Sequence, residues 1–149
     1  MKINPIEPVF LDYKKDINET NLKNGITVRN IENTTNQLFS MNYVFEMGDN
    51  HDKEMALAVE YLPFIGTSKY SPSEIQQEFY KIGCDFDVFS SDERTYVSLS
   101  GLNENFDKGV ELFEHLLSDA QPEEEALKNM VSNILKERSD AKLNKGSIL

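Results

Sequence analysis

The stretch Leu57–Thr67, LAVEYLPFIGT, decides how the rest of this chain is interpreted. It begins inside a segment whose apolar residues recur at helical spacing, which predicts a helix over 53–62; these residues are Met55, Ala58, Val59 and Leu62. Pro63 ends or kinks that helix, because proline has no amide hydrogen to donate and clashes with the preceding turn.

An apolar strand precedes this helix and a capped helix follows it. Segment 37–47 alternates, which predicts a strand lying over a core; its apolar face carries Phe39, Met41, Tyr43, Phe45 and Met47. Segment 48–52 then breaks the strand. Ser71-Pro72-Ser73-Glu74 predicts a helix start, because the serine can cap the first turn, the proline suits it and the glutamate completes a capping box. Gly83 is placed to end that helix.

A hairpin and two more helices are predicted further along the chain. Segments 84–89 and 94–102 alternate apolar and polar residues on either side of a polar turn, which predicts two paired strands. Apolar residues at helical spacing predict a helix over 105–117 and a second one from Pro122 to about Lys142. The second helix starts with Glu123, Glu124 and Glu125, which favour the positive end of a helix dipole.

The predicted order of elements is β-β-α-α-β-β-α-α, with segment 26–31 as the first strand. This order implies an α+β fold, in which an antiparallel-rich sheet has helices packed on one face. Residues 1–21 lack periodicity and are interrupted by Pro5 and Pro8, so we expect a linker or tether there. Residues 22–149 are expected to form a single α+β domain, and the chain is expected to be a fragment of a longer one.

Composition and charge limit the possible partners. The chain has 149 residues, of which 39% are hydrophobic and 28% charged, a composition typical of soluble globular proteins. Its net charge of -11 disfavours nucleic acid and anionic membranes as partners. No apolar run reaches the roughly 18 residues of a membrane span, and residues 1–5 lack a signal-peptide apolar region. The single Cys84 excludes an intrachain disulfide, and its alternation with Phe86 and Val88 predicts a buried thiol; the compartment stays unassigned.

Taken in order, several motifs resemble the insulinase/pitrilysin family of zinc metallopeptidases. The similarity covers roughly residues 22–143 and rests on the ordered set rather than on any one motif. The matching stretches are Asn24-Gly25-Ile26-Thr27-Val28, Val44-Phe45-Glu46-Met47-Gly48, the segment 62–70, the segment 76–91 with Ile82-Gly83-Cys84, and Pro122-Glu123-Glu124-Glu125.

The resemblance also shows what this chain lacks. In the family a helix carries His-x-x-Glu-His, whose histidines bind zinc while the glutamate activates the attacking water. Here Leu57 and Tyr61 stand at the histidine positions and only Glu60 remains, while Glu137 stands where the third ligand would fall. A zinc site needs three protein ligands and leucine cannot ligate. The resemblance therefore implies four degenerate positions and no catalytic, cofactor-binding or metal-binding residue in this chain.

Family members have two similar halves, each with two α+β units, which close around a peptide. This chain resembles the first unit of the second, non-catalytic half. The resemblance implies a domain that helps to wall a substrate chamber, with the catalytic half, in the same or a partner chain, and a peptide substrate as its partners. Zinc is then expected in the catalytic half of a parent metalloendopeptidase, and this chain alone is not expected to be an enzyme.

Two other interpretations remain open, namely a separate non-catalytic partner subunit of a zinc peptidase and an unrelated α+β module that binds proteins or peptides. The remaining clusters of polar residues predict no further site. His51, with Asp49, Asp52 and Glu54, suits a turn and a helix start better than a metal loop. His115 is predicted to lie on the surface of a helix.

Overall fold

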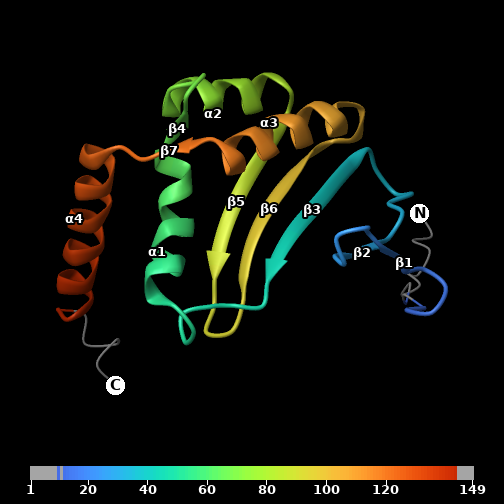
Figure 1. Cartoon of the computed structure of the whole chain (residues 1–149), viewed down its shortest axis with the longest axis horizontal. Helices are drawn as coiled ribbons and strands as arrows, with labels where there is room; N and C mark the ends of the chain where they lie inside the picture. The colour runs from blue at the N-terminus through green and yellow to red at the C-terminus, as the bar shows by residue number, and fades with distance from the viewer. Residues whose placement is uncertain (1–9, 11, 144–149) are drawn as a thin grey trace, which may run out of the picture. The chain divides into compact units, whose positions relative to one another are not determined.

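The structure is a computed structural model that describes residue 10 and residues 12–143. The chain divides into two compact units, Met1–Asn36 and Gln37–Leu149. The elements β1 and β2 belong to the first unit and all the others to the second (Figure 1).

The first unit contains one hairpin. Strand β1 (Asn18–Asn21) pairs antiparallel with β2 (Thr27–Asn30). Gly25 sits in the turn with a φ of +86°, a conformation that glycine adopts without strain, and Ile26 N donates to Asn24 Oδ1. Strand β1 lies inside residues 1–21, which were predicted to form a linker or tether. Its side chains show no apolar alternation, so only the pairing of its backbone with β2 identifies it as a strand.

A three-stranded antiparallel sheet forms the centre of the second unit, in the order β3-β6-β5. The strands are β3 (Leu38–Phe45), β5 (Cys84–Ser90) and β6 (Thr95–Leu102). Strand β6 buries Thr95, Val97 and Leu99, while the residues between them face the other way. This alternation confirms the predicted hairpin of β5 and β6 and makes one face of the sheet a core face.

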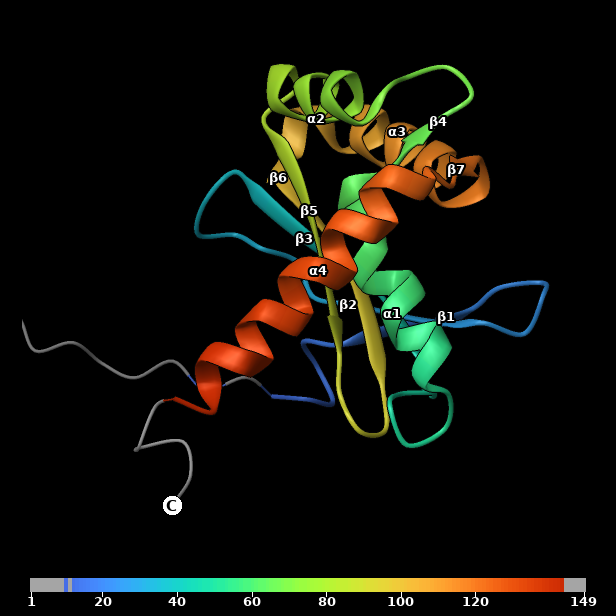
Figure 2. The same ribbon diagram turned by 90° about the vertical axis from the view of Figure 1, so that its left-hand side faces the viewer.

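Helices α2 (Pro72–Lys81) and α3 (Phe106–Ser118) pack on that core face. Figures 1 and 2 show both helices together at one end of the sheet. The buried cluster draws on every layer of the unit and comprises Tyr61, Leu62, Ile65, Ile75, Phe79, Cys84, Val97, Leu99, Phe113, Leu116 and Met130. The predicted α+β fold, with an antiparallel-rich sheet and helices on one face, is therefore confirmed.

The remaining elements connect these layers. Helix α1 (Lys53–Tyr61) continues into the 3-10 turn η1 (Leu62–Phe64), and η2 (Asn103–Asn105) leads into α3. A two-stranded ladder joins β4 (Gly66–Thr67) to β7 (Ala120–Gln121), and α4 (Glu124–Ala141) follows. The ladder of β4 and β7 was not predicted, because strands of two residues carry no periodic pattern.

The predicted helix boundaries agree with the caps that the structure shows. Ser71 and Glu74 form the capping box of α2, and Asp52 accepts from the amides of Glu54 and Met55 at the start of α1. Gly83 follows the last turn of α2 with a φ of +61°, and its amide donates to Tyr80 O. These local signals placed the ends of α1 and α2 to within one residue.

Helix α3 approaches the sheet closely at Cys84. A Cβ added at Gly109 would lie 2.9 Å from Cys84 Sγ, and one added at Gly101 would lie 2.5 Å from the same sulfur. Cys84 is 5% exposed, which confirms the predicted buried thiol, and burial raises the pKa of that thiol. The glycines thus leave room for the sulfur between α3 and the sheet.

Gly109→Ala should destabilise the fold, because the added methyl group meets the Cys84 sulfur. We expect a net loss of about 1–2 kcal/mol, even though alanine favours a helix over glycine by about 1 kcal/mol. In a Cys84→Ala background the same substitution should cost clearly less, since the obstructing atom is gone. Urea unfolding of the four proteins in a double-mutant cycle measures this coupling. Equal costs in both backgrounds would contradict the steric explanation.

Candidate functional site

Helix α1 carries three of the four positions that the resemblance predicted to be degenerate, and they lie in different environments. Leu57 is 44% exposed, Glu60 is also exposed, and Tyr61 is only 8% exposed. Leu57 and Tyr61 therefore do not form a joint pocket at this face of the helix. Tyr61, which the resemblance places at the second histidine position, is instead part of the core.

Tyr61 joins the end of α1 to the start of α4. Its hydroxyl donates to Glu123 O over 2.5 Å and accepts from Glu123 N over 2.8 Å. Glu123 is the N-cap residue of α4, so the phenol group bonds to both backbone groups at this helix start, and the Glu123 carbonyl also accepts from Leu127 N. We call this pair of hydrogen bonds the Tyr61 clamp.

Glu137 lies far from the clamp along α4. It is exposed, and at 1.5 Å per residue it stands about 21 Å further along the helix than Glu123. Among residues 10 and 12–143, no group of three or more histidine, cysteine, aspartate or glutamate side chains is placed to hold a metal ion. The described residues thus offer neither the donor set nor the spacing of a zinc site.

A polar cluster that sequence analysis missed holds the β4 loop against α3. Ser68 donates from its amide and its hydroxyl to Asp119 Oδ2, over 3.0 and 2.5 Å. The hydroxyl of Ser68 is the main cause that holds the pKa of Asp119 below its ordinary value. The Ser68 contacts therefore fix the loop that follows the Gly66-Thr67 strand.

His115 belongs to the same cluster and is not the surface residue that was predicted. Its Nε2 lies 3.0 Å from Thr67 Oγ1 and 3.8 Å from Asp119 Oδ2, and its ring stands edge-on to Tyr70. Thr67 Oγ1 already accepts from the amides of Lys69 and Tyr70, so its own hydrogen is available for the imidazole. The four-residue spacing of His115 and Asp119, about one helical turn, is the sequence signal that could have revealed this cluster.

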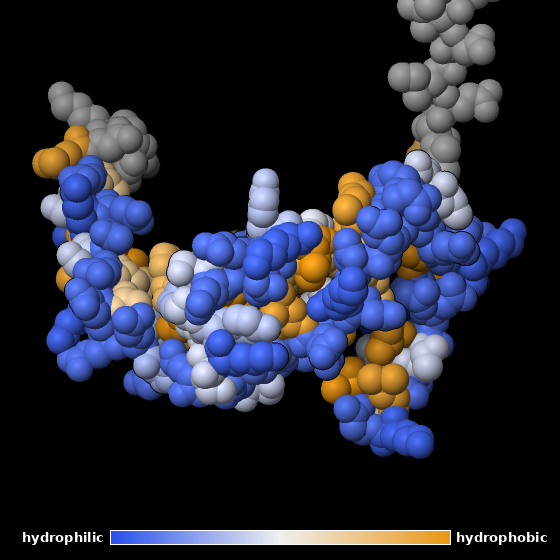
Figure 3. All heavy atoms as spheres, turned by 90° about the horizontal axis from the view of Figure 1, so that it is seen from above, coloured by the Kyte–Doolittle hydropathy of each residue, from blue (hydrophilic) through white to orange (hydrophobic). Residues whose placement is uncertain are grey.

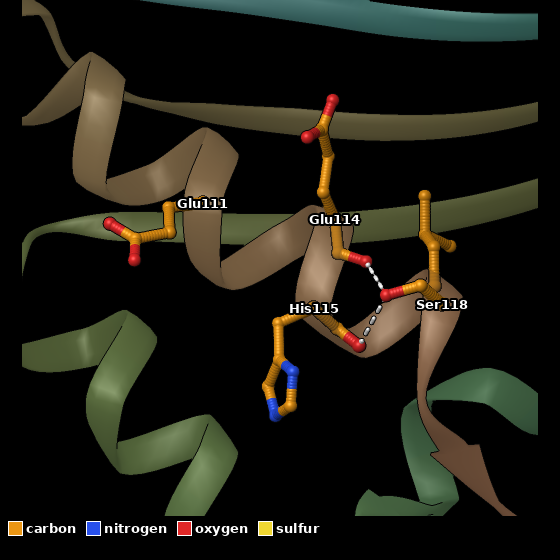
Figure 4. Close-up of a pocket in the computed structure, with 5 residues that line it drawn as sticks. Glu111, Glu114, His115 and Ser118 are labelled. Carbon is orange, nitrogen blue, oxygen red and sulfur yellow. Dashed lines mark hydrogen bonds between the residues drawn. The ribbon is translucent and has the colours of Figure 1, made fainter.

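A shallow depression of about 540 Å³ lies along α3 beside this cluster (Figure 4). Its lining side chains point in different directions: Glu111 projects away from His115, and Ser118 turns back to its own helix (Figure 4). Ser118 Oγ donates to the carbonyls of Glu114 and His115, so its hydrogen is already used. These side chains form no nucleophile and base pair.

Tyr43 approaches the same region from β3. Its hydroxyl donates to Glu114 Oε1 over 2.9 Å. Burial of the phenol, followed by the neighbouring carboxylate, raises the pKa of Tyr43. The hydroxyl is therefore held in its neutral, donating form and ties β3 to α3.

The His51 cluster has the structural role that the sequence favoured. Asp52 caps α1, and His51 Nδ1 accepts weakly from Gly48 N over 3.4 Å. Asp49 accepts from Ser90 Oγ over 2.8 Å. The three side chains thus shape the turn between β3 and α1.

The chain matches the family described as Insulinase (Peptidase family M16) over residues 28–149. It therefore belongs to peptidase family M16, as the ordered motifs predicted. It is 25% identical over 140 residues to an uncharacterised zinc protease of Rickettsia felis, covering 91% of this chain and 34% of that protein. It is 26% identical over 125 residues to the beta subunit of the mitochondrial-processing peptidase of Neurospora crassa, covering 81% of this chain and 26% of that protein.

Solved structures share the fold. A peptidase M16 inactive domain from Pseudomonas fluorescens superimposes with a TM-score of 0.79 at 19% identity, covering 89% of this chain and 34% of that one. The periplasmic protease PqqL of Escherichia coli superimposes with a TM-score of 0.72 at 16% identity, covering 95% of this chain and 16% of that one. The chain thus spans about a third or less of the length of these relatives. No helix among the described residues is long and apolar enough to cross a membrane.

Tyr61→Phe should destabilise the fold, because it removes both hydrogen bonds of the clamp while keeping the buried ring. We expect a loss of about 1–3 kcal/mol in the free energy of unfolding, since the amide of Glu123 loses its partner, while the carbonyl of Glu123 still accepts from Leu127 N. Urea unfolding followed by circular dichroism measures it. Tyr80→Phe is the matched control, because Tyr80 is 86% exposed and should change stability little. Equal effects of the two substitutions would show that the clamp contributes nothing.

Asp119 should make stability depend on pH at the acid end. Its folded-state pKa is depressed, so its contribution is present above the unfolded carboxyl value of about 3.9 and is lost as the pH falls through the folded-state value. The stability difference between the natural chain and Asp119→Asn should therefore shrink between about pH 5 and about pH 2. Unfolding free energies across this range measure it, with Glu111→Gln as a control that removes an exposed carboxylate from the same helix. A constant difference would contradict the assignment.

Proposed function

We propose that this chain is a non-catalytic α+β unit that helps to wall the substrate chamber of a two-halved M16 peptidase. In this proposal the zinc ion and the cleavage chemistry belong to the catalytic half, and this unit contributes surface and shape. Peptide bonds are cut by the whole protein and not by this chain alone.

The Tyr61 clamp is the observation that carries the proposal. The position that would hold a zinc-binding histidine is occupied by a buried phenol whose hydrogen-bonding capacity is directed at the backbone of Glu123. Leu57 brings no donor atom, and Glu60 is exposed rather than aimed at a bound water. The helix has thus kept its place in the fold while its side chains serve packing.

Similarity to known proteins supports the same assignment. The structural relative from Pseudomonas fluorescens is described as an inactive M16 domain, and the Rickettsia relative is described as a zinc protease about three times as long as this match. A family with both descriptions is consistent with active and inactive units in one protein. The alternative of a separate partner subunit is favoured by one observation, since the Neurospora relative is itself called a subunit.

We assign the uncovered face of the sheet to the chamber side. Residues in register across the three strands form rows on this face, the first of which joins Val44, Tyr96 and Phe89. Val44 is 49% exposed and Phe89 is 60% exposed, so apolar surface is available to an extended peptide. The next row, Asn42, Ser98 and Asp87, offers hydrogen-bonding groups.

Zinc binding and peptide hydrolysis test this proposal together. The natural chain should show neither tight zinc binding nor hydrolysis of quenched fluorescent peptides. Leu57→His with Tyr61→His should gain zinc binding, because two imidazoles one helical turn apart can bind one ion together. It should gain no cleavage, because Glu137 lies about 21 Å along α4 from Glu123, the residue that Tyr61 contacts, and cannot complete the site. Calorimetric zinc titration and the peptide assay measure the two properties.

The single variant Leu57→His is the matched control for the titration, since one added imidazole should bind zinc much more weakly. Circular dichroism confirms that the double variant is folded despite losing the Tyr61 clamp. Absence of zinc binding by the folded double variant would contradict the alignment of α1 with the zinc helix. Hydrolysis by the natural chain, if it resists removal of a contaminating protease, would overturn the non-catalytic assignment.

A further inference from the structure

The outer face of α4 carries an apolar stripe that no described residue covers. Leu127, Val131 and Leu135 recur every four positions and are 44%, 41% and 60% exposed. The core-facing side of the helix, with Met130 and Ile134, lies next to this stripe. Figure 2 shows α4 nearest the viewer, and in Figure 3 its region at the left of the view has apolar side chains beside hydrophilic ones. A shallow hollow of about 410 Å³ follows the stripe.

A negative residue, Glu124, flanks one end of the stripe, and a positive residue, Arg138, flanks the other end. Glu124 lies three positions before Leu127, and Arg138 lies three positions after Leu135, so both share the face of the stripe. Glu124 pairs with Lys128 over 2.6 Å within the helix, where both side chains are strongly exposed. Arg138 makes no ion pair with any residue of the described part of the chain.

These five residues are arranged symmetrically about Val131. Leu127 and Leu135 are equally distant from it along the helix, and so are Glu124 and Arg138. If a second α4 lies antiparallel with Val131 opposite Val131, each Leu127 meets a Leu135 and each Glu124 meets an Arg138. The face is therefore complementary to itself in both apolar pattern and charge, as a twofold interface requires.

We propose that the outer face of α4 is a self-association surface, whose partner is a second copy of this chain with its α4 antiparallel and centred on Val131. Burial of the three apolar side chains supplies the driving force, and the two Glu124–Arg138 contacts select the antiparallel register. A single helix face makes a small interface, so the dimer is expected to be weak and dependent on concentration.

Sedimentation equilibrium of the full chain tests this proposal. The average mass should rise from 17.1 kDa toward twice that value as the concentration increases from about 5 to about 500 µM. Val131→Glu places two like charges together on the twofold axis and should weaken association about tenfold or more. Asn133→Glu is the matched control, because it adds the same charge to an exposed position on the far side of the same helix, and it should leave the mass unchanged.

A mixing experiment tests the register itself. Glu124→Arg and Arg138→Glu should each dissociate their own homodimer, since like charges then face each other at both ends of the interface. An equimolar mixture should associate again, because every contact in the mixed dimer joins opposite charges. Recovery by mixing cannot arise from a loss of folding in either variant.

Three results would overturn the proposal. A mass of 17.1 kDa throughout the concentration range would mean that another protein or a further part of the parent chain covers the stripe. Association that survives Val131→Glu would place the interface elsewhere. Association that is lost in both charge variants and not restored by mixing would exclude the antiparallel register.

Discussion

The close approach of α3 to the sheet is the constraint on which the second unit depends. Gly101 and Gly109 leave the space that the Cys84 sulfur fills, and this brings Phe113 and Leu116 of α3 into the core. The same helix then carries His115 and Asp119 to the β4 loop. From β7 the chain continues directly into α4, so the position of α3 also sets the place at which Tyr61 meets Glu123.

The environments of Leu57, Glu60 and Tyr61 follow from this arrangement. Side chains of α1 also fill the space between α1 and the start of α4. Tyr61 does so with a ring in the core and a hydroxyl bonded to two backbone groups, while Leu57 and Glu60 lie at the surface. The chain therefore has the fold of an M16 unit, and Tyr61 of α1 contributes packing and hydrogen bonding to it.

Most of the fold could be predicted from local signals in the sequence. The capping box at Ser71, the cap at Asp52 and the alternation of β6 each act within a few residues, so pattern alone identifies them. The ladder of β4 and β7 and the environment of His115 could not be predicted, because they depend on residues about fifty positions apart. Strand β1 was not predicted for a related reason. Its exposed side chains carry no apolar pattern, and its pairing with β2 is made by backbone groups.

The Tyr61 clamp also affects the stage of folding at which α1 and α4 become linked. A link between two helices that runs through a metal ion forms only after the ion is acquired, so its strength follows metal supply and the protonation of the ligands. The link between α1 and α4 here consists of one side chain and one peptide unit, both encoded in the chain. The link between α1 and α4 can therefore form as the chain folds, without waiting for a metal ion.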